Sequence, residues 1–176
     1  MGNNLGIFWL RKDFRLLRND ALSFASQNHD SVVAVYIFKK SEFEKKREAQ
    51  RWWIYRSLKS FEEELSKYNI NLELIISENY QSALSKILEK KNRSIYWNKI
   101  YEPKYLSFDN KFSDLLEKKE VEYKIFKGNI LNEYLDVKKS DGTPFKVFTP
   151  FWKNAEPIYL NKGFSKKNLV KKKINN

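Results

Sequence analysis

The chain has 176 residues and carries 34 lysine and arginine side chains against 22 acidic ones, which gives a formal net charge of +12. This length favours a single domain, and the aromatic fraction of 16% argues against disorder. The absence of cysteine excludes disulfides, thiolate metal sites and cysteine nucleophiles, and no run of 18 apolar residues is present that predicts a membrane-spanning helix.

The first third of the chain alternates between strand-like and helix-like apolar patterns. Gly6–Leu10 is a short apolar run typical of a buried strand, and a helix is predicted over Ala21–Asn28. Val32–Phe38 is continuous, β-branched and without polar alternation, which indicates a strand buried on both faces. A long helix is predicted over Glu48–Tyr68, because apolar side chains recur there at every third or fourth residue.

The same alternation continues through the next third of the chain. Strands are predicted at Leu72–Ile76, Ser94–Trp97 and Val121–Phe126, and helices at Ser82–Lys91 and Tyr105–Glu120. Five strands alternating with helices indicate an α/β fold, with a Rossmann-like, doubly wound, five-stranded and mostly parallel sheet that has helices on both faces. No glycine-rich phosphate motif is present, so a ligand is expected at the carboxyl ends of the strands, where the strand order reverses.

The pattern divides the chain into three parts. Residues 1–127 are predicted to form the α/β domain, and residues 161–176 a Lys-rich, mobile tail. Residues 128–160 lack helical periodicity, so they are interpreted as an irregular, aromatic-rich segment that packs on the domain or begins a linker. The tail holds six lysines and no acid, and it therefore supplies half of the net charge.

Several segments together resemble one protein family. Phe8–Leu16, followed by Arg18–Leu22, is similar to the opening motif of the DNA photolyases and cryptochromes, in which a first strand ends in R-x-D-[LF]-R-L. Asn98–Pro103 resembles their N-x-x-Y-E-P stretch, and Gly142–Trp152 resembles their G-x-P-[YF]-x-V-F-T-P-F-[WY] segment. Arg51 with Ser57 and Leu58 fits their helix pattern, and the matches occur in the family's order from about residue 6 to residue 154.

The resemblance implies an antenna domain. In that family an α/β antenna domain is joined to a larger helical domain, which binds FAD and receives a pyrimidine dimer flipped out of DNA. No residue of this chain matches an FAD ligand, and the resemblance ends where the linker begins. It therefore implies part of a light-driven DNA repair protein, and for this chain alone a truncated or split-gene product without catalysis. The implied partners are a separate helical FAD-binding domain and, in a complete assembly, damaged DNA.

The resemblance also implies a bound antenna chromophore of deazaflavin, flavin or folate type, with FAD only where the helical domain is supplied. In folate-binding relatives an Asn-Glu pair follows the Tyr-Glu stretch, whereas here those places hold Lys104 and Tyr105. Candidate chromophore ligands are the residues that follow three of the strands, namely Arg11, Phe38, Lys39, Asn98 and Glu102. They are expected to converge on one edge, because the carboxyl ends of parallel strands lie together. Tyr36 and Phe38 offer an aromatic wall for a flat anionic ring, although core packing explains them equally well.

A second group of residues is expected to have structural or interdomain roles: Asp13, Arg15, Trp52, Phe148, Phe151 and Trp152. Asp13 is expected to pair with an arginine. Trp52 and the adjacent Trp53 point to different faces of their helix, so one is expected in the core and the other at the surface. His29 lies in a polar stretch and is expected on a surface loop.

Two other functions remain open at this point. The chain is also compatible with a stand-alone α/β module that binds a small ligand or a nucleotide in the same crevice. Alternatively, the basic tail predicts weak, nonspecific binding of nucleic acid. The first ten residues lack a basic stretch ahead of their apolar run, so no secretory leader is expected, and we expect a cytoplasmic protein without metal or membrane partners.

Overall fold

The computed structural model describes residues 4–89, 92–131, 133, 136–161 and 168–173. In chain order the elements are β1 (Leu5–Leu10), α1 (Asp20–Asn28), β2 (Ser31–Lys39), α2 (Lys40–Phe43), α3 (Glu48–Ser66), β3 (Asn71–Ser77), α4 (Tyr80–Leu88), β4 (Arg93–Asn98), α5 (Pro103–Lys118), β5 (Tyr123–Phe126) and α6 (Phe148–Asn161).

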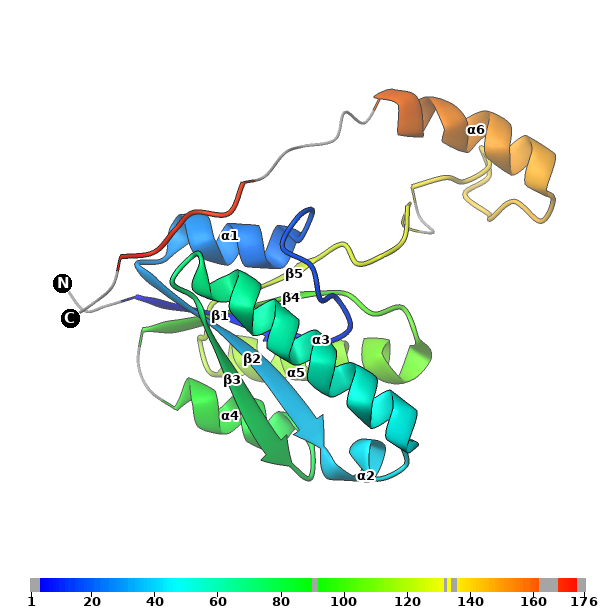
Figure 1. The fold of residues 1–176 in the computed structure, drawn as a ribbon. Coiled ribbons are helices and arrows are strands. Elements are labelled where there is room, and N and C mark those ends of the chain that lie inside the picture. The colour runs from blue at the N-terminus through cyan, green and yellow to red at the C-terminus, as the bar shows by residue number, and fades with distance from the viewer. Residues whose placement is uncertain (1–3, 90–91, 132, 134–135, 162–167, 174–176) are drawn as a thin grey trace.

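The strands form one parallel sheet in the order β3-β2-β1-β4-β5. Figure 1 shows α1 and α3 over one face of the sheet and α4 and α5 over the other. The two faces follow from the alternation of side chains along each strand, because Phe8 of β1 packs with the α1 and α3 side chains and its neighbour Ile7 with those of α4 and α5. The predicted α/β fold with a five-stranded sheet is confirmed.

The predicted elements agree with the observed ones to within a few residues at each end. The four predicted helices correspond to α1, α3, α4 and α5. The end predicted for the third of them, at Lys91, lies outside the described residues. Helix α2 is short and was not predicted, because four residues are too few to show a helical apolar period.

The segment expected to be irregular, residues 128–160, contains helix α6 instead. Its two prolines look like helix breakers in the sequence. However, Pro150 lies in the first turn, where the missing N–H is not needed, and Pro157 removes a single backbone hydrogen bond near the other end. Helix α6 lies apart from the sheet in Figure 1. Neither it nor any other described helix has both the length and the apolar character that crossing a membrane requires.

The end of the chain is partly anchored to the α/β domain. We call residues 168–173 the C-terminal strap, which runs beside α1 in Figure 1. Leu169 packs against the core between α1 and α3, and the Lys172 N–H donates to the Tyr68 carbonyl at 2.9 Å. The buried Lys172 ammonium donates to the His29 carbonyl, and burial lowers its pKa. Within the expected mobile tail, the strap thus has contacts with the α/β domain, while residues 162–167 and 174–176 lie outside the described part.

His29 is buried, in contrast to the surface position expected for it. Its Nε2 atom lies 2.6 Å from the Tyr96 hydroxyl, which in turn donates to a carboxylate oxygen of Glu122 at 3.0 Å. The imidazole ring packs over Gly6, where an added Cβ would come within 2.7 Å of the ring. Burial lowers the pKa of His29, so the neutral ring is the form that this site favours.

Candidate functional site

The sheet has a point of reversal between β1 and β4. The chain moves from β1 to β2 and β3 on one side, and then to β4 and β5 on the other. Loops that follow β1 and β4 therefore diverge, and a crevice opens between them at the carboxyl edge of the sheet. The ends of β1, β2 and β4 at Leu10, Lys39 and Asn98 lie along this edge.

A pocket of about 320 Å³ lies in this crevice, and we call it the aromatic pocket. Six aromatic rings form most of its wall, and four charged side chains stand among them. The lining residues are Trp9, Leu10, Arg11, Lys12, Phe14, Tyr36, Ile37, Glu42, Lys46, Trp53, Ile54, Tyr80, Ile100 and Tyr105. Apolar walls with a few polar groups are typical of sites that bind small organic molecules.

Glu42 and Tyr80 form the polar side of the aromatic pocket. The Tyr80 hydroxyl donates to one Glu42 carboxylate oxygen at 2.8 Å, and the other oxygen lies 3.6 Å from the Lys39 ammonium and 3.8 Å from that of Lys104. Burial, together with the Glu42 carboxylate, raises the pKa of Tyr80, and burial raises the pKa of Tyr36 to about 12. Both phenols are therefore neutral at physiological pH, and Glu42 provides an anionic acceptor.

Arg11 reaches the pocket wall, but its charge is neutralised inside the protein. Its guanidinium contacts both carboxylate oxygens of Asp109, at 2.9 and 3.2 Å, and donates to the Asn98 carbonyl. The guanidinium carbon lies 4.7 Å from the centre of the Trp9 ring. Burial raises the pKa of Asp109, while the Arg11 guanidinium acts in the opposite direction. The pair joins the loop after β1 to α5, beside the wall of the pocket.

Asn98 is a structural connector at the end of β4. Its amide nitrogen donates to the side chains of Asp13 and Asn19, and its amide oxygen accepts the Ala21 N–H at 3.3 Å. Asp13 also accepts the Arg11 N–H, so its bonds in the described part of the chain are to amide groups of the domain. These bonds fix the loop after β1 and the start of α1 to β4.

The five candidate chromophore ligands share the carboxyl edge but not a single cavity. Asn98 and Glu102 line a neighbouring hollow of about 370 Å³, where Glu102 pairs with Lys12 at the surface. Phe38 lines a groove between α3 and β3, and Lys39 lies at a hollow beside the start of α4. Of the five, Arg11 alone lines the aromatic pocket.

Several residues of the pocket were not among the predicted ligands, notably Glu42, Tyr80 and Tyr105. Glu42 belongs to the short helix α2, and Tyr80 begins α4 after β3. The rule that ligands gather at strand ends pointed to this region, but no sequence motif marks these side chains. The aromatic wall suggested by Tyr36 is present, together with rings from more distant segments.

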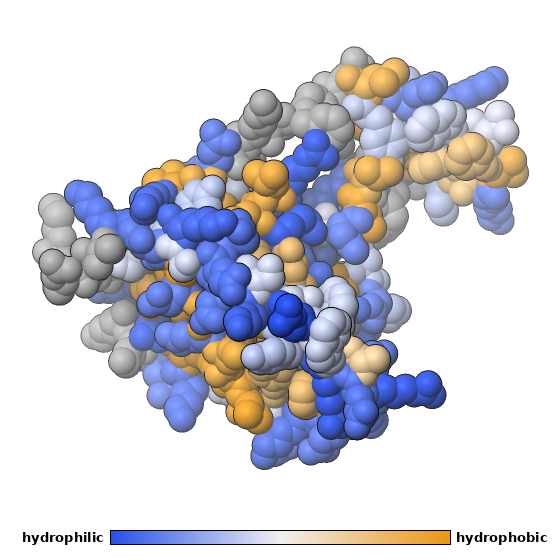
Figure 2. All heavy atoms as spheres, viewed as in Figure 1, coloured by the Kyte–Doolittle hydropathy of each residue, from blue (hydrophilic) through white to orange (hydrophobic). Residues whose placement is uncertain are grey.

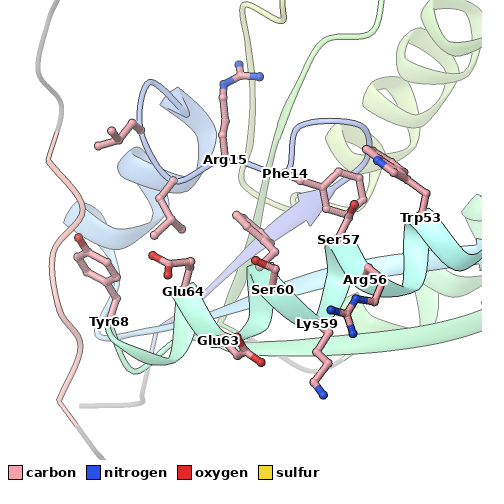
Figure 3. A pocket seen from close by; sticks show the side chains of 13 residues that line it. Phe14, Arg15, Trp53, Arg56, Ser57, Lys59, Ser60, Glu63, Glu64 and Tyr68 are labelled. Atoms are coloured by element: carbon pink, nitrogen blue, oxygen red, sulfur yellow. The ribbon is translucent and has the colours of Figure 1, made fainter.

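A second, wider hollow of about 1040 Å³ lies between the loop after β1 and helix α3. Figure 3 shows Phe14 and Trp53 at one end of it, where their ring centres are 5.9 Å apart. Both residues also line the aromatic pocket, so the two cavities share a wall. Arg15 extends away from α3 in this view, and its Nε atom donates to the Arg18 carbonyl at 3.3 Å.

The tryptophan pair of α3 differs from the expectation that one member is buried in the core. Trp52 is 65% exposed and Trp53 57% exposed, because the buried face of α3 is formed by other residues, such as Ile54 and Leu58. The two rings nevertheless have different surroundings. Trp53 lines both cavities, whereas Trp52 lines neither and has the Arg56 guanidinium over its ring at 5.9 Å.

An exposed aromatic surface is present on α6. Phe148 is 70% exposed and stacks on Trp152, with ring centres 6.1 Å apart and nearly parallel planes. Phe151 lies against Phe145 at 6.5 Å. Figure 2 shows hydrophobic side chains along this helix. The three α6 residues predicted to have interdomain roles thus lie together on one helix.

The chain is similar to known proteins in both sequence and fold. The family model of DNA photolyase matches residues 6–168. Among curated proteins, the deoxyribodipyrimidine photo-lyase of Agrobacterium fabrum is 31% identical over 150 residues, which cover 85% of this chain and 31% of the relative. Cryptochrome-2 of Arabidopsis thaliana is 28% identical over 153 residues, which cover 85% of this chain and 25% of the relative.

The fold of this chain is also similar to that of photolyases whose structures have been solved. A bacterial class III photolyase from Agrobacterium tumefaciens superimposes with a TM-score of 0.78 at 26% identity, over 99% of this chain and 36% of the other. An archaeal photolyase from Sulfolobus tokodaii, described as holding two FAD molecules with an implied novel light-harvesting cofactor, gives a TM-score of 0.66 at 27% identity, over 85% and 34%. The chain spans about a quarter to a third of the length of these relatives.

Proposed function

Because the chain belongs to the DNA photolyase family and corresponds to the N-terminal part of its relatives, we propose that the aromatic pocket binds a light-harvesting chromophore. Photolyases bind flavin and antenna cofactors. The observation that carries the proposal is the enclosure of the pocket by aromatic rings at the point of strand reversal.

The size of the pocket favours a single ring system. A volume of about 320 Å³ lies at the lower end of the range for small-molecule sites, of about 300–1,000 Å³. The tricyclic ring of a flavin is the part of the ligand that this space would enclose. The ribityl or longer chain of the ligand would leave through the open rim, near Lys12 and Lys46, whose ammonium groups suit an anionic substituent.

The polar groups of the pocket favour a flavin or deazaflavin over a folate. Glu42 is an acceptor for the imide N–H of such a ring, and the neutral Tyr36 hydroxyl is a donor for its carbonyl oxygens. The rings of Trp53 and Tyr105 are placed to pack against an aromatic ligand. Tyr105 stands in one of the two places that hold an Asn-Glu pair in folate-binding relatives, so this chain lacks those polar groups.

In a complete assembly the chain would supply the antenna and a docking surface. The family's light-driven repair of pyrimidine dimers depends on FAD held by a helical domain. We therefore expect no light-dependent repair of thymine dimers by this chain alone, even with FAD added. Measurable repair under blue light, with no partner protein present, would contradict this assignment.

The exposed aromatic surface of α6 is the proposed contact for the helical domain. Phe148 and Trp152 offer a flat apolar face that water would otherwise cover. We expect the chain to bind a hydrophobic dye, and the double variant Phe148→Ser, Trp152→Ser to bind much less while it keeps its circular dichroism spectrum. Unchanged dye fluorescence in that variant would remove α6 from the contact.

The chromophore proposal can be tested with a matched pair of adjacent tryptophans. We would titrate the purified chain into riboflavin, FMN and a 5-deazaflavin and follow the loss of ligand fluorescence. Trp53→Ala removes a ring from the pocket wall and should weaken binding by tenfold or more. Trp52→Ala removes a similarly exposed ring of the same helix that lines neither of the two cavities described above, and should leave affinity unchanged.

Three outcomes would count against the proposal. Binding that is equally sensitive to both tryptophan variants would place the ligand elsewhere on α3. Tighter binding of ADP than of any flavin would favour the alternative of a nucleotide-binding module. Binding of a reduced folate, without any flavin binding, would contradict the assigned chromophore class.

A further inference from the structure

Strand β3 forms an unusually open edge of the sheet. Within the described part of the chain it pairs with β2 alone, so one row of its backbone N–H and C=O groups faces outward. Edge strands are commonly shielded by lysine, proline or a bulge, whereas the sequence of β3 has Glu73 as its single charged residue. The apolar side chains Leu74 and Ile76 are 54% and 71% exposed.

Apolar surface continues from this edge onto the neighbouring helix. A groove of about 350 Å³ runs between α3 and β3, and most of its lining is apolar: Phe38, Phe43, Ile54, Tyr55, Leu58, Leu72 and Leu74, with Arg51, Lys59 and Glu62. In Figure 2, hydrophobic side chains gather over the place where Figure 1 draws β3. The edge therefore combines free hydrogen-bonding groups with an apolar border, as in surfaces that accept an added strand.

We propose that two copies of this chain associate through antiparallel pairing of their β3 strands, which joins the two sheets into one. The strand is complementary to itself, because Leu72, Leu74 and Ile76 alternate along the face that borders the groove. In a two-fold interface, any contact between one residue of the first copy and a different residue of the second also forms in the reverse direction. Lys59 and Glu62 carry opposite charges on the same groove wall, so Lys59 of each copy can face Glu62 of the other across the axis.

The register of this pairing follows from the geometry of antiparallel strands. Along an edge strand, the N–H and C=O groups of every second residue point outward. In an antiparallel pair, two residues that lie directly opposite each other form either both of their mutual N–H···O=C hydrogen bonds or neither. A symmetric pair must therefore be centred on a residue, and Glu73, Leu74 and Ile75 are the central choices. Centring on Glu73 would place two carboxylates opposite each other, which is unfavourable. Centring on Leu74 pairs all seven residues of Asn71–Ser77 and places Leu72 opposite Ile76 of the second copy.

The absence of cysteine from the chain allows a direct test of this register. In the proposed dimer, Leu74→Cys places two thiols directly opposite each other, within the Cα separation of about 4.4–6.8 Å that a disulfide needs. Ile76→Cys places them four residues apart along the strands, about 13 Å, which is too far. Mild oxidation should therefore cross-link the first variant and not the second. Cross-linking of Ile76→Cys alone, or of neither variant, would overturn the register.

The association itself can be measured by sedimentation velocity between about 5 and 200 μM. We expect twice the mass of the chain at the upper end, and a monomer for Leu74→Lys at every concentration. Leu17→Lys is the control, because Leu17 is 80% exposed but lies in the loop after β1. The proposal would be overturned if the wild type were a monomer at every concentration. It would also be overturned if Leu74→Lys still formed the dimer while the α6 variant Phe148→Ser, Trp152→Ser lost it. No residue of the aromatic pocket belongs to β3, so this result is independent of flavin binding.

Discussion

Removal of one partner from the buried ion pair between Arg11 and Asp109 is predicted to destabilise this domain more than the loss of any surface pair. Both side chains are at most 5% exposed, and the guanidinium contacts the two carboxylate oxygens at 2.9 and 3.2 Å. Asp109→Ala leaves the Arg11 charge buried with the Asn98 carbonyl as its remaining acceptor among the contacts described. Removal of one partner from such a pair costs about 3–5 kcal/mol of the free energy of unfolding.

Urea denaturation followed by tryptophan fluorescence measures this cost. With a slope of about 2 kcal/mol per molar urea, the midpoint should fall by about 1.5–2.5 M. Replacement of both partners in Arg11→Met, Asp109→Leu should restore part of the loss, because no isolated charge then remains buried. Glu102→Gln is the control, since it breaks the half-exposed pair with Lys12 and should change the free energy of unfolding by less than about 0.5 kcal/mol.

The reasoning would be refuted if Asp109→Ala unfolded within about 1 kcal/mol of the wild type with an unchanged slope. That result would mean that Arg11 finds water or another acceptor at little cost. A double variant less stable than Asp109→Ala alone would show that packing of the guanidinium, and not its charge, is the main contribution.

Three further predictions concern other parts of the domain. The pKa of the buried His29 is lowered on folding, so the unfolded chain takes up the proton first and the free energy of unfolding should fall as the pH drops below 6.5, the ordinary pKa of histidine. His29→Gln should flatten this pH dependence between pH 7.5 and 5.5 in urea titrations. An unchanged pH dependence in that variant would exclude His29 as its source. Leu169→Ala should destabilise the chain by about 1–2 kcal/mol in the same assay, because Leu169 packs the strap onto the core; no change would indicate a strap that makes no stabilising contact. Asn98→Ala should lower the free energy of unfolding by about 1–3 kcal/mol, because the Ala21 N–H loses its acceptor, and should leave flavin affinity unchanged. A loss of flavin affinity without a loss of stability would show that Asn98 contacts the ligand.

The fold could be predicted because its three central strands, β1, β2 and β4, are largely buried on both faces. Val32–Phe38 has no polar alternation, and such a run has few interpretations once helical segments flank it. Features that depend on distant contacts were missed. His29, in the loop between α1 and β2, is buried beside Tyr96 of β4, which offers it a hydrogen-bonding partner. The strap contacts Tyr68, which its own lysine-rich sequence does not indicate.

The five candidate ligands were expected to converge on one edge of the sheet, and they lie along that edge without lining one common cavity. The strand-end rule fixes where Arg11 and Asn98 lie along the sheet, but not the direction in which their side chains point. The Arg11 guanidinium donates to the carboxylate of Asp109, on a helix far along the chain, and the Asn98 amide nitrogen donates to the side-chain oxygen of Asn19. The residues that do line the aromatic pocket, such as Glu42, lie there because of the path of a loop, which a periodic pattern cannot show.

The central position of β1 has a consequence for the order in which the chain folds. Leu5 of β1 pairs with Ser31 on one side and with Arg93 on the other. The first pairing closes a short loop, whereas the second must close a much longer one, so its entropic cost is greater and it forms later. At about 5–20 residues per second, a ribosome would release β1 several seconds before β4 exists to cover it. During that interval the future centre of the sheet is itself an open edge, and it is there that a chaperone or a misfolding competitor would pair.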